Sequence, residues 1–428
     1  MERFTGLIGV VLILGIAYLM SNNRKAIKLR LVVSGLAIQL GLAIFILRTE
    51  TGQVTFNWVG GKIQRLLEMA DKGGEFVFGG LVRPDLLHPI FGDQYSFLFM
   101  FKIMPTIIFV SVLVSVAYHI GLMQLLVSYL ARLVHFLMHV SGSEALSNVA
   151  STFVGQVEAQ IMIKPYISSM TMSELLASMS GSMACIAGGV MAVYISMGVP
   201  APYLLAASIM AAPAALVISK IVWPETEESA TKGAVTLEVK KTHANLLDAI
   251  SHGAADGLKV SLNVIAMLIG FIALIALVNA LFIKLGVLLG MAGVKLDVIG
   301  LNVSNLTLDS IFGSIFSIFA WAMGVPGSET HTVGTLLGTK LVINEFVAYS
   351  KLSPMIAQHS LSPKALIITS FALCGFANFS SIAIQVGGIG ELAPDRRKDL
   401  ARLGFKALVC GTLASYLSAT IAGILSQL

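Results

Sequence analysis

The stretch that decides the fold reads Phe153-Val-Gly-Gln-Val-Glu-Ala159, and it places Gln156 and Glu158 inside sequence that is otherwise apolar enough for a membrane. An ionisable residue at that depth costs about 2.5 to 3.5 kcal/mol on insertion scales, so a functional role is the first hypothesis. Gly155 beside these polar residues indicates backbone that leaves the helix, which membranes tolerate only inside protein or along a watery cavity. The stretch is therefore predicted to be the tip of a re-entrant hairpin.

The composition around this stretch predicts an all-α polytopic membrane protein. Hydrophobic residues make up 56% of the 428 residues, charged residues make up 12%, and the mean hydropathy is +0.86. Apolar runs near the roughly 20 residues that a helix needs to cross a bilayer recur along the whole chain. The net charge of +5 comes from basic residues in short loops, which set orientation in the lipid bilayer and do not indicate a nucleic-acid partner. Cys185, Cys374 and Cys410 have neither zinc-site nor disulfide spacing and are predicted to be packing residues.

About eight membrane spans are predicted, together with interfacial helices at 59–70 and 122–140. The spans are 4–20, 31–47, 97–119, 171–197, 202–222, 258–282, a broken segment from 365, and 407–425. The first span could pass for a signal peptide, but basic sequence follows it in place of a small-residue cleavage site. His135 and His139 could ligate a metal, but no carboxylate or cysteine completes a site there, so an interfacial helix is favoured.

The basic loops predict how the chain is oriented. One cluster contains Arg24, Lys25, Lys28 and Arg30, and the other contains Arg396, Arg397, Lys398, Arg402 and Lys406. Basic loops favour the cytoplasmic side, so both clusters are expected there and both termini are expected on the external side.

A second interrupted segment, 311–340, is broken by Pro326 and Glu329 and is predicted to mirror the first hairpin, 142–169. Corresponding interruptions in two halves of a membrane protein indicate a transporter built from inverted repeats. Five parts of the chain are distinguished: 1–140 with the first spans and interfacial helices, 141–222 with the first hairpin and two spans, 223–257 as a cytoplasmic connector with an amphipathic approach, 258–310 with a central span and an external segment, and 311–428 with the second hairpin and the last two spans.

Three spaced motifs resemble those of the concentrative nucleoside transporters. They read Val154-Gly-Gln-Val-Glu-Ala159 with Lys164-Pro-Tyr166, then Asn344-Glu-Phe-Val-Ala-Tyr349, then Cys374-Gly-Phe-Ala-Asn-Phe-Ser-Ser-Ile-Ala-Ile-Gln-Val-Gly-Gly-Ile-Gly390. The motifs occur in the family's order, and the resemblance covers most of the chain from about Phe97 onward. It implies a symporter that imports nucleosides across the cytoplasmic (inner) membrane, coupled to a cation gradient, with no organic cofactor.

The same resemblance implies an assembly and a mechanism. Each protomer of a homotrimer would hold a scaffold, in 1–140 and 258–310, and a transport domain, in 141–222 and 311–428. The transport domain would carry the substrate across the membrane by an elevator-like motion.

The resemblance also implies which residues bind the nucleoside. A nucleoside presents ribose hydroxyls and a base edge of mixed donors and acceptors, so its pocket needs carboxylates and amides around an apolar slot. By resemblance, Gln156 and Glu158 face the base, while Glu345, Asn378 and Ser381 face the ribose. Phe376 lies in the pocket wall, and the remaining contacts are Val157 and Val190. Relatives commonly carry threonine or serine where this chain has Val157, so their base selectivity does not transfer and the choice between pyrimidines and purines stays open.

The coupling-ion positions depart from the sodium-coupled pattern. Relatives use an asparagine four residues before the hairpin glycine, a serine or threonine further on, and backbone carbonyls. The matching positions here are Ser151 and Cys185, with carbonyls from Val154 and Ile186. Sodium prefers oxygen ligands, so a thiol is a poor replacement for a hydroxyl. A proton carried by Glu158 or Glu345 is therefore favoured over sodium at these four residues, and water completing a weak sodium site remains the alternative.

Some polar residues have two interpretations. Gln385 and Ser380 either belong to the site or bond helices together, as amides and hydroxyls commonly do in membranes. Glu174 and Glu391 lie near predicted span ends, where a solvated face is expected.

Three other classes of function are weaker. A membrane enzyme would need a nucleophile with a base or a metal cluster, and neither Gly-x-Ser-x-Gly nor His-Glu-x-x-His occurs. A passive channel would favour a ring of carbonyls or charges over two broken hairpins. A carrier for another small polar metabolite is the remaining alternative.

Overall fold

The structure is a computed structural model that describes residues 2–91, 98–232, 243–291 and 306–426. Every regular element in these ranges is helical, so the predicted all-α membrane fold is confirmed. Six described helical segments are long and apolar enough to cross a bilayer: Leu29–Arg48, Met100–His119, Met172–Ser196, Ala201–Val222, Leu246–Met291 and Pro394–Leu425. The other two predicted spans are α1 (Glu2–Leu19) and the pair α17 (Pro363–Leu373) and α18 (Phe379–Leu392), which are shorter.

The N-terminal part contains four α-helices. They are α1, α2 (Leu29–Arg48), α3 (Glu50–Phe78) and α4 (Pro84–Phe91), with short 3-10 turns η1 (Arg24–Ala26) and η2 (Gly79–Val82) between them. The Thr49 hydroxyl accepts a hydrogen bond from the Gly52 amide at 3.0 Å and so starts α3. The predicted interfacial helix 59–70 is the middle of α3, which buries Leu67 and Ala70 and exposes its charged face.

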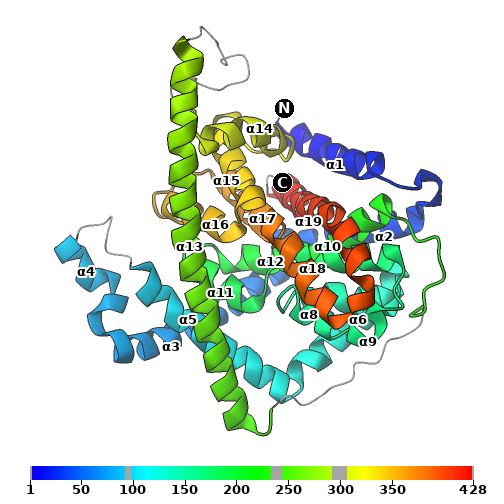
Figure 1. Ribbon diagram of the computed structural model, residues 1–428, viewed down its shortest axis with the longest axis horizontal. Coiled ribbons are helices and arrows are strands. Elements are labelled where there is room, and N and C mark those ends of the chain that lie inside the picture. The colour runs from blue at the N-terminus through cyan, green and yellow to red at the C-terminus, as the bar shows by residue number, and fades with distance from the viewer. Residues whose placement is uncertain (1, 92–97, 233–242, 292–305, 427–428) are drawn as a thin grey trace.

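The rest of the chain runs twice through one order of elements, coloured cyan to green and then green to red in Figure 1. Each half has a long helix, a shorter apolar helix, a hairpin, a broken span and a closing helix. The first half is α5 (Phe99–His119), α6 (Leu122–Met138), α7 (Gly142–Ser151), α8 (Glu158–Ile161), α9 (Lys164–Ile167), α10 (Met172–Ala184), α11 (Gly188–Ser196) and α12 (Ala201–Val222). The second half is α13 (Leu246–Met291), α14 (Leu308–Ala322), α15 (Thr330–Val342), α16 (Glu345–Ala357), α17, α18 and α19 (Arg397–Leu425), with 3-10 turns η6 (Gly327–Glu329) and η7 (Pro394–Arg396).

The second hairpin lies later in the chain than predicted. Segment 311–340 belongs to α14 and α15, and α14 corresponds to α6, which precedes the first hairpin. Gly324, with φ of +97°, turns the chain between α14 and α15 and is not a hairpin tip. The counterpart of the first hairpin is α15 with α16, and its tip is at Ile343 and Asn344. Glu158 and Glu345 are thus each the first residue of the second arm of a hairpin.

Two other segments differ from the predicted ranges. Segment 171–197 is one predicted span, but its helix breaks at Cys185–Ala187 into α10 and α11. The central span, predicted at 258–282, is part of the 46-residue helix α13, because no proline interrupts the sequence on either side of it. Residues 92–97, which end at the start of the span predicted at 97–119, lie outside the described residues, as do 233–242 of the connector and 292–305 of the predicted external segment.

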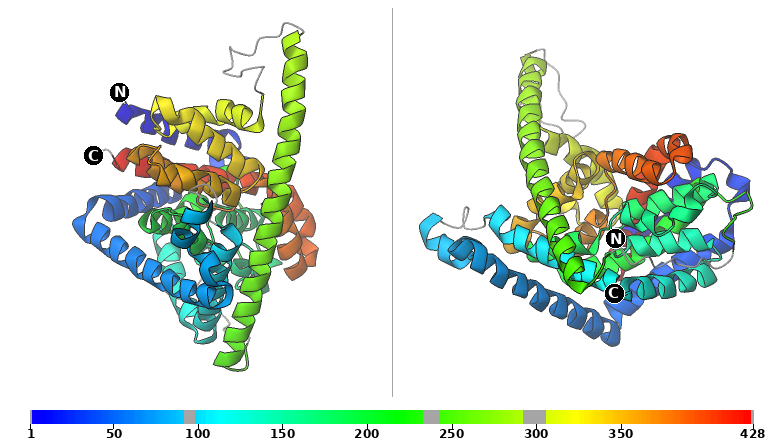
Figure 2. Two further views of the ribbon diagram at one scale, coloured as in Figure 1. Left: turned by 90° about the vertical axis from the view of Figure 1, so that its left-hand side faces the viewer. Right: turned by 60° about the horizontal axis from the view of Figure 1, so that its bottom comes forward.

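The core is formed by helices from both halves. α10, α12 and α19 pack against one another, and α17 packs on α12 and α19. Both views in Figure 2 show one end of the long green helix α13 reaching beyond the other helices. α13 exposes large apolar side chains such as Ile269, Ile272, Leu277 and Leu281. A helix this apolar and this exposed is suited to a lipid surface or to another protein surface.

Candidate functional site

The broken spans of the two halves cross at their breaks. The Phe376 amide donates a hydrogen bond to the Cys185 carbonyl at 3.2 Å. Gly375 has φ of +140°, and a Cβ atom there would lie 2.6 Å from the Ala184 carbonyl oxygen, so only glycine fits. The crossing brings the free ends of four short helices to one place inside the membrane protein. Such ends are where backbone groups remain available for ligands.

Glu345 lies at this crossing and is 5% exposed. It begins α16, where Asn344 caps the helix by accepting from the Val347 amide at 2.9 Å. Its carboxylate accepts from Tyr194 Oη at 3.2 Å and from Asn378 Nδ2 at 3.1 Å. A negative charge at a helix N-terminus is also favoured by the helix dipole. The structure thus brings together Glu345 and Asn378, for which ribose contact stays a prediction.

Asn378 is fixed by its own helix. It caps α18, and its Oδ1 atom accepts from the Ser381 amide at 3.0 Å and from Ser380 Oγ at 2.6 Å. Ser381 is therefore held next to Asn378 and is 1% exposed. Ser380 is exposed and is a second support for the same amide oxygen. Of the two residues whose role was undecided, Ser380 thus bonds to a predicted site residue.

Tyr194 is a site residue that the sequence reasoning missed. Its ring stacks on Tyr349 with centroids 4.1 Å apart, and its hydroxyl reaches Glu345. A signal was present, because a buried tyrosine in an apolar span usually finds a partner for its hydroxyl. Val190 lies one helical turn before Tyr194 on α11 and is half-buried, as is Phe376.

A buried lysine was also missed. Lys340 on α15 is 1% exposed and donates to the carbonyl of Ala372, near the end of α17, at 2.7 Å. Helix C-termini favour cations, which explains how this charge is accommodated.

The tip of the first hairpin also lies at the crossing. The Gly188 amide at the start of α11 donates to the Phe153 carbonyl at 3.0 Å. Gln156 Oε1 accepts from Gln385 Nε2 at 3.4 Å, and the same Gln385 nitrogen contacts the Met179 carbonyl at 3.2 Å. Gln385 therefore supports a predicted base-facing residue.

Glu158 is placed differently from Glu345. It is exposed, it makes no hydrogen bond to another described residue, and its carboxylate lies against Gly155. A side chain at Gly155 would displace this exposed and flexible carboxylate, so the glycine leaves Glu158 room to lie against the hairpin tip.

The predicted cation residues line a buried region beside the hairpin tip. Ser151, Val154, Cys185 and Ile186 are each at most 5% exposed. Ser151 Oγ donates to the Ser147 carbonyl at 2.8 Å and contacts Ser182 Oγ at 2.9 Å. The Cys185 thiol contacts Thr152 Oγ1 at 3.9 Å. Within the described residues, the carbonyls of Val154 and Ile186 accept no backbone hydrogen bond, so two buried oxygens remain available.

A network next to Ser151 centres on Gln160, which the sequence reasoning did not single out. Gln160 Nε2 donates to Ser147 Oγ at 3.1 Å and to Ser182 Oγ at 2.7 Å, and its Oε1 atom accepts from Ser178 Oγ at 2.6 Å. These bonds use both protons of Gln160 Nε2 and one of the two lone pairs of Oε1. The network therefore holds the hairpin rigidly against α10.

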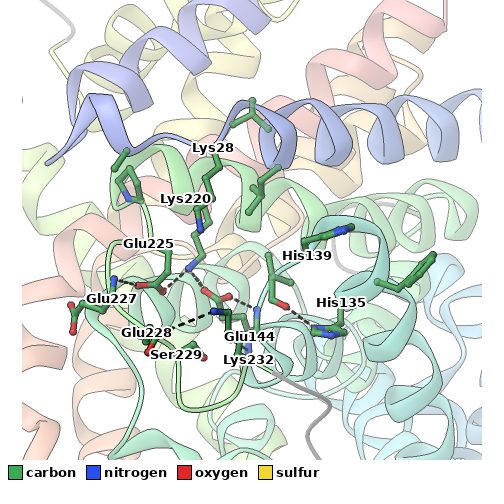
Figure 3. Close-up of a pocket in the computed structure, with 17 residues that line it drawn as sticks. Lys28, His135, His139, Glu144, Lys220, Glu225, Glu227, Glu228, Ser229 and Lys232 are labelled. Carbon is green, nitrogen blue, oxygen red and sulfur yellow. Dashed lines mark hydrogen bonds and ion pairs between the residues drawn. The ribbon is translucent and has the colours of Figure 1, made fainter.

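A cavity of about 470 Å³ lies elsewhere, and none of the predicted nucleoside or cation residues lines it (Figure 3). Its walls carry the buried Lys220 ammonium, which pairs with the Glu144 carboxylate and lies 3.3 Å from Glu225 Oε2. His135 and His139 face different partners there, the Val140 carbonyl and the Arg30 guanidinium. The cavity therefore belongs to the ion pairs that join α7, α12 and the connector.

The expectation for Glu174 was wrong, while Glu391 is exposed as expected. Glu174 is 1% exposed, accepts from the Thr171 amide at 2.8 Å in a capping box, and accepts from Ser229 Oγ at 2.5 Å. A carboxylate three residues after a threonine caps the start of α10, and the connector then covers it.

Comparisons with known proteins agree with this geometry. Family models described as Na+ dependent nucleoside transporter N-terminus and C-terminus match residues 8–81 and 203–423, and one described as Nucleoside recognition matches 100–201. An uncharacterized transporter of Haemophilus influenzae is 44% identical, covering 99% of this chain and 98% of the relative. The nucleoside permease NupC of Helicobacter pylori is 37% identical, covering 97% of this chain and 96% of the permease.

Solved structures give the same result. CNTnw in an inward-facing substrate-bound state has a TM-score of 0.91 at 40% identity, covering 100% of this chain and 98% of that one. A double variant of CNTnw in an outward-facing state has the same TM-score, identity and coverage. The chain therefore belongs to the concentrative nucleoside transporter family, whose members are transporters and not enzymes.

Proposed function

We propose that this chain is a secondary active symporter that imports nucleosides across the cytoplasmic membrane, coupled to an inward cation gradient. The observation that carries the proposal is the buried Glu345 carboxylate, placed with Asn378 and Tyr194 where the two broken spans cross. A buried carboxylate in a membrane has no low-energy structural use, so a ligand of matching chemistry is the better explanation. The nucleoside relatives described above support the same substrate class.

Ribose recognition follows from the open lone pairs at this crossing. A carboxylate offers about four acceptor sites, and Glu345 uses two of them on Tyr194 and Asn378. The remaining sites can accept from ribose hydroxyls, which are donors. Ser381 and Asn378 would complete the ribose contacts, and Phe376 and Val190 would form the apolar wall.

Base recognition would use the hairpin tip. Gln156 presents an amide that both accepts and donates, and Gln385 orients it. Glu158 is free to accept from a base amine or imide because it has no bond to another described residue. Val157 contributes only apolar contact, so the base pocket has one hydroxyl fewer than in relatives with threonine there.

Alternating access would use the division into scaffold and transport domain. We place both hairpins and both broken spans in the transport domain, 141–222 and 311–428, and the long helices α5 and α13 in the scaffold. An elevator-like displacement would carry the helix crossing from one side of the membrane to the other. The apolar exposed face of α13 supports a homotrimer whose subunits meet at the scaffold. Both termini would be external, because the two basic clusters favour the cytoplasmic side.

We propose the proton as the coupling ion. Ser151 Oγ donates its proton to the Ser147 carbonyl. The neighbouring Cys185 offers a thiol, which is a poor ligand for sodium. The carbonyls of Val154 and Ile186 with water are the alternative sodium ligands. Glu158 and Glu345 are the groups that would carry the proton.

Uptake by purified protein in proteoliposomes tests the function. A carrier shows saturable uptake of labelled uridine that unlabelled nucleoside preloaded inside the vesicles accelerates by counterflow, and we expect this result. Linear, non-saturable flux would indicate a passive channel, and recovery of a cleaved product would indicate an enzyme. Competition of labelled uridine by a panel of purine and pyrimidine nucleosides, with unrelated polar metabolites as controls, then defines the substrate class.

A further inference from the structure

Three polar side chains gather at the start of α13, far in sequence from every residue of the transport site. They are His243, Asp248 and His252, and one ligand atom from each lies within 4.8 Å of the other two. His252 Nε2 is 3.5 Å from Asp248 Oδ1, and His243 Nδ1 is 3.9 Å from Asp248 Oδ2. We propose that these residues bind a divalent transition-metal ion of the zinc class.

The first argument concerns the proton on His243. The Ser115 hydroxyl has a single proton, and it donates this proton to the Ala249 carbonyl at 2.7 Å. The 3.4 Å contact between Ser115 Oγ and His243 Nε2 therefore has the histidine as donor. In the neutral ring, Nδ1 then carries a lone pair, and its neighbour is an Asp248 oxygen that is also an acceptor. Two acceptors at 3.9 Å repel each other unless a cation lies between them.

The second argument is that the carboxylate is held in position before any ion arrives. Asp248 Oδ2 accepts from the Ala244 amide at 2.9 Å, and the Asp248 amide donates to Asn245 Oδ1 at 2.9 Å. These bonds fix the turn from His243 into α13. His252 follows Asp248 by four residues and lies on the same helical face.

The distances suit a tetrahedral ion. Zinc lies about 2.0 to 2.1 Å from histidine nitrogen and about 2.0 to 2.2 Å from carboxylate oxygen, so two such ligands are roughly 3.4 Å apart at a tetrahedral angle. The two histidine–carboxylate separations of 3.5 and 3.9 Å are near this value, and all three ligand atoms lie within 4.8 Å of one another, so rotation of the histidine side chains would have to close the remaining gap. Two imidazoles and one carboxylate leave a fourth position for water, since His252 is mostly exposed.

Nearby groups add to this picture. His119, at the end of α5, has its ring centroid 6.4 Å from that of His243, and its buried Nδ1 atom has no hydrogen-bond partner within the described residues. α5 and α13 pack along each other, and Figure 1 shows the lower end of α13 close to the cyan helices that follow the α5 label. A bound ion would fasten the residues before α13 to the helix itself, where the second half of the chain begins.

Zinc titration of tag-free, full-length protein in detergent tests this site, because a polyhistidine tag would itself bind zinc. After chelator treatment and its removal, zinc is titrated in competition with a chromophoric chelator. We expect one zinc per wild-type chain and an affinity at least about tenfold lower in Asp248→Asn and His252→Gln. Asp256→Asn is the matched control, because Asp256 lies on the same helix, is exposed and, among the described residues, forms an ion pair with Lys259 alone, at 3.9 Å.

Cobalt substitution of the wild-type protein gives a second readout that needs no variant. A tetrahedral nitrogen and oxygen site produces visible absorption bands much stronger than those of hydrated cobalt, and equimolar zinc should abolish them. Absence of zinc binding, equal affinity in the wild type and both ligand variants, or an absorption spectrum of hydrated cobalt alone would each overturn the proposal. Uridine binding by the variants verifies that they are folded.

Discussion

The side chain of Val157 lies directly on Gly388, so that a Cβ atom at Gly388 would be 2.7 Å from Val157 Cγ2 and 2.9 Å from Cγ1. Val157 belongs to the tip of the first hairpin, and Gly388 belongs to α18 in the second half. The valine that distinguishes this hairpin therefore occupies the space that the glycine leaves. The contact joins the two repeats at the predicted base side of the site.

Gly388→Ala should reduce uridine uptake by displacing the hairpin tip. The added methyl group overpacks the contact with Val157, and such overpacking typically costs about 1 to 3 kcal/mol. Gly387→Ala is the control, because no atom lies within 4 Å of a Cβ built there. The double variant Val157→Ala with Gly388→Ala should recover most of the uptake. Equal uptake by the two single glycine variants would show that this contact has no functional role.

Glu345→Gln should abolish or severely weaken nucleoside binding. Tyr194 and Asn378 both donate to this carboxylate, and an amide would turn its NH₂ group toward one of these donors. Hydrogen bonds to a charged group are worth about 1.5 to 3 kcal/mol, so losing one lowers affinity by roughly ten to a hundredfold. Calorimetry with uridine measures the change. The exposed carboxylate of Glu391 provides the control Glu391→Gln, which should bind normally. A correctly inserted Glu345→Gln protein with wild-type affinity would contradict the assignment.

Tyr194→Phe should lower nucleoside affinity by about tenfold while leaving the fold intact. The substitution removes one donor from the Glu345 carboxylate but keeps the ring that stacks on Tyr349 at 4.1 Å. Tyr416→Phe is a suitable comparison, because the buried Tyr416 hydroxyl has no hydrogen-bond partner within the described residues. Uridine affinity and thermal unfolding are measured for both. An equal effect of the two substitutions would argue that Tyr194 acts only in packing.

Gln156→Ala and Asn378→Ala should each lose more affinity than Gln385→Ala. The first two are predicted to contact the nucleoside, whereas Gln385 acts through its 3.4 Å bond to Gln156. Because Gln156 and Gln385 share a bond, the double variant should lose less than the sum of the single losses. A double-mutant cycle of uridine affinity measures this coupling. Strict additivity would mean that Gln385 does not position Gln156.

Much of the fold was predictable because the membrane limits backbone to helices with few exceptions. Apolar runs and basic loops predicted the spans. The polar residues Gln156 and Glu158, which interrupt apolar sequence, predicted the first hairpin. The break at Cys185–Ala187 was not visible, since its residues are apolar and the unpaired carbonyl of Ile186 leaves no trace in composition. The second hairpin was misplaced because Pro326 and Glu329 are stronger sequence signals than the turn at Ile343 and Asn344.

Hydrogen bonds between residues on different helices were less predictable from the sequence than the identities of single site residues. Glu345 and Asn378 were singled out by motif, but the bond between them depends on how α16 and α18 meet. Tyr194 and Gln160 lie in segments that look like ordinary span and hairpin sequence, so only packing identifies their partners. Glu174 looked like a span-end carboxylate on a solvated face, but the connector buries it.

The coupling ion can be tested at Ser151, where the ligand set differs from that of sodium-coupled relatives. Ser151 Oγ donates its proton to the Ser147 carbonyl and contacts Ser182 Oγ, so one of its two lone pairs is left for a cation. Cys185 is fully buried and contributes sulfur where a hard cation prefers oxygen. Because Ser151 and Cys185 are weak sodium ligands, a sodium ion would depend on water and on the open carbonyls of Val154 and Ile186. We therefore expect the proton gradient to drive accumulation.

Uridine uptake into proteoliposomes, with each gradient imposed separately, decides between the ions. An inward proton gradient without sodium should accumulate uridine, and an inward sodium gradient at equal pH should not. The double variant Ser151→Asn with Cys185→Ser restores an amide oxygen and a hydroxyl, so it should gain sodium-stimulated uptake, while Cys410→Ser, another buried cysteine outside this region, should not. Accumulation by the wild type under sodium alone, with no response to protons, would overturn the assignment and show that Ser151 and the two backbone carbonyls suffice for sodium.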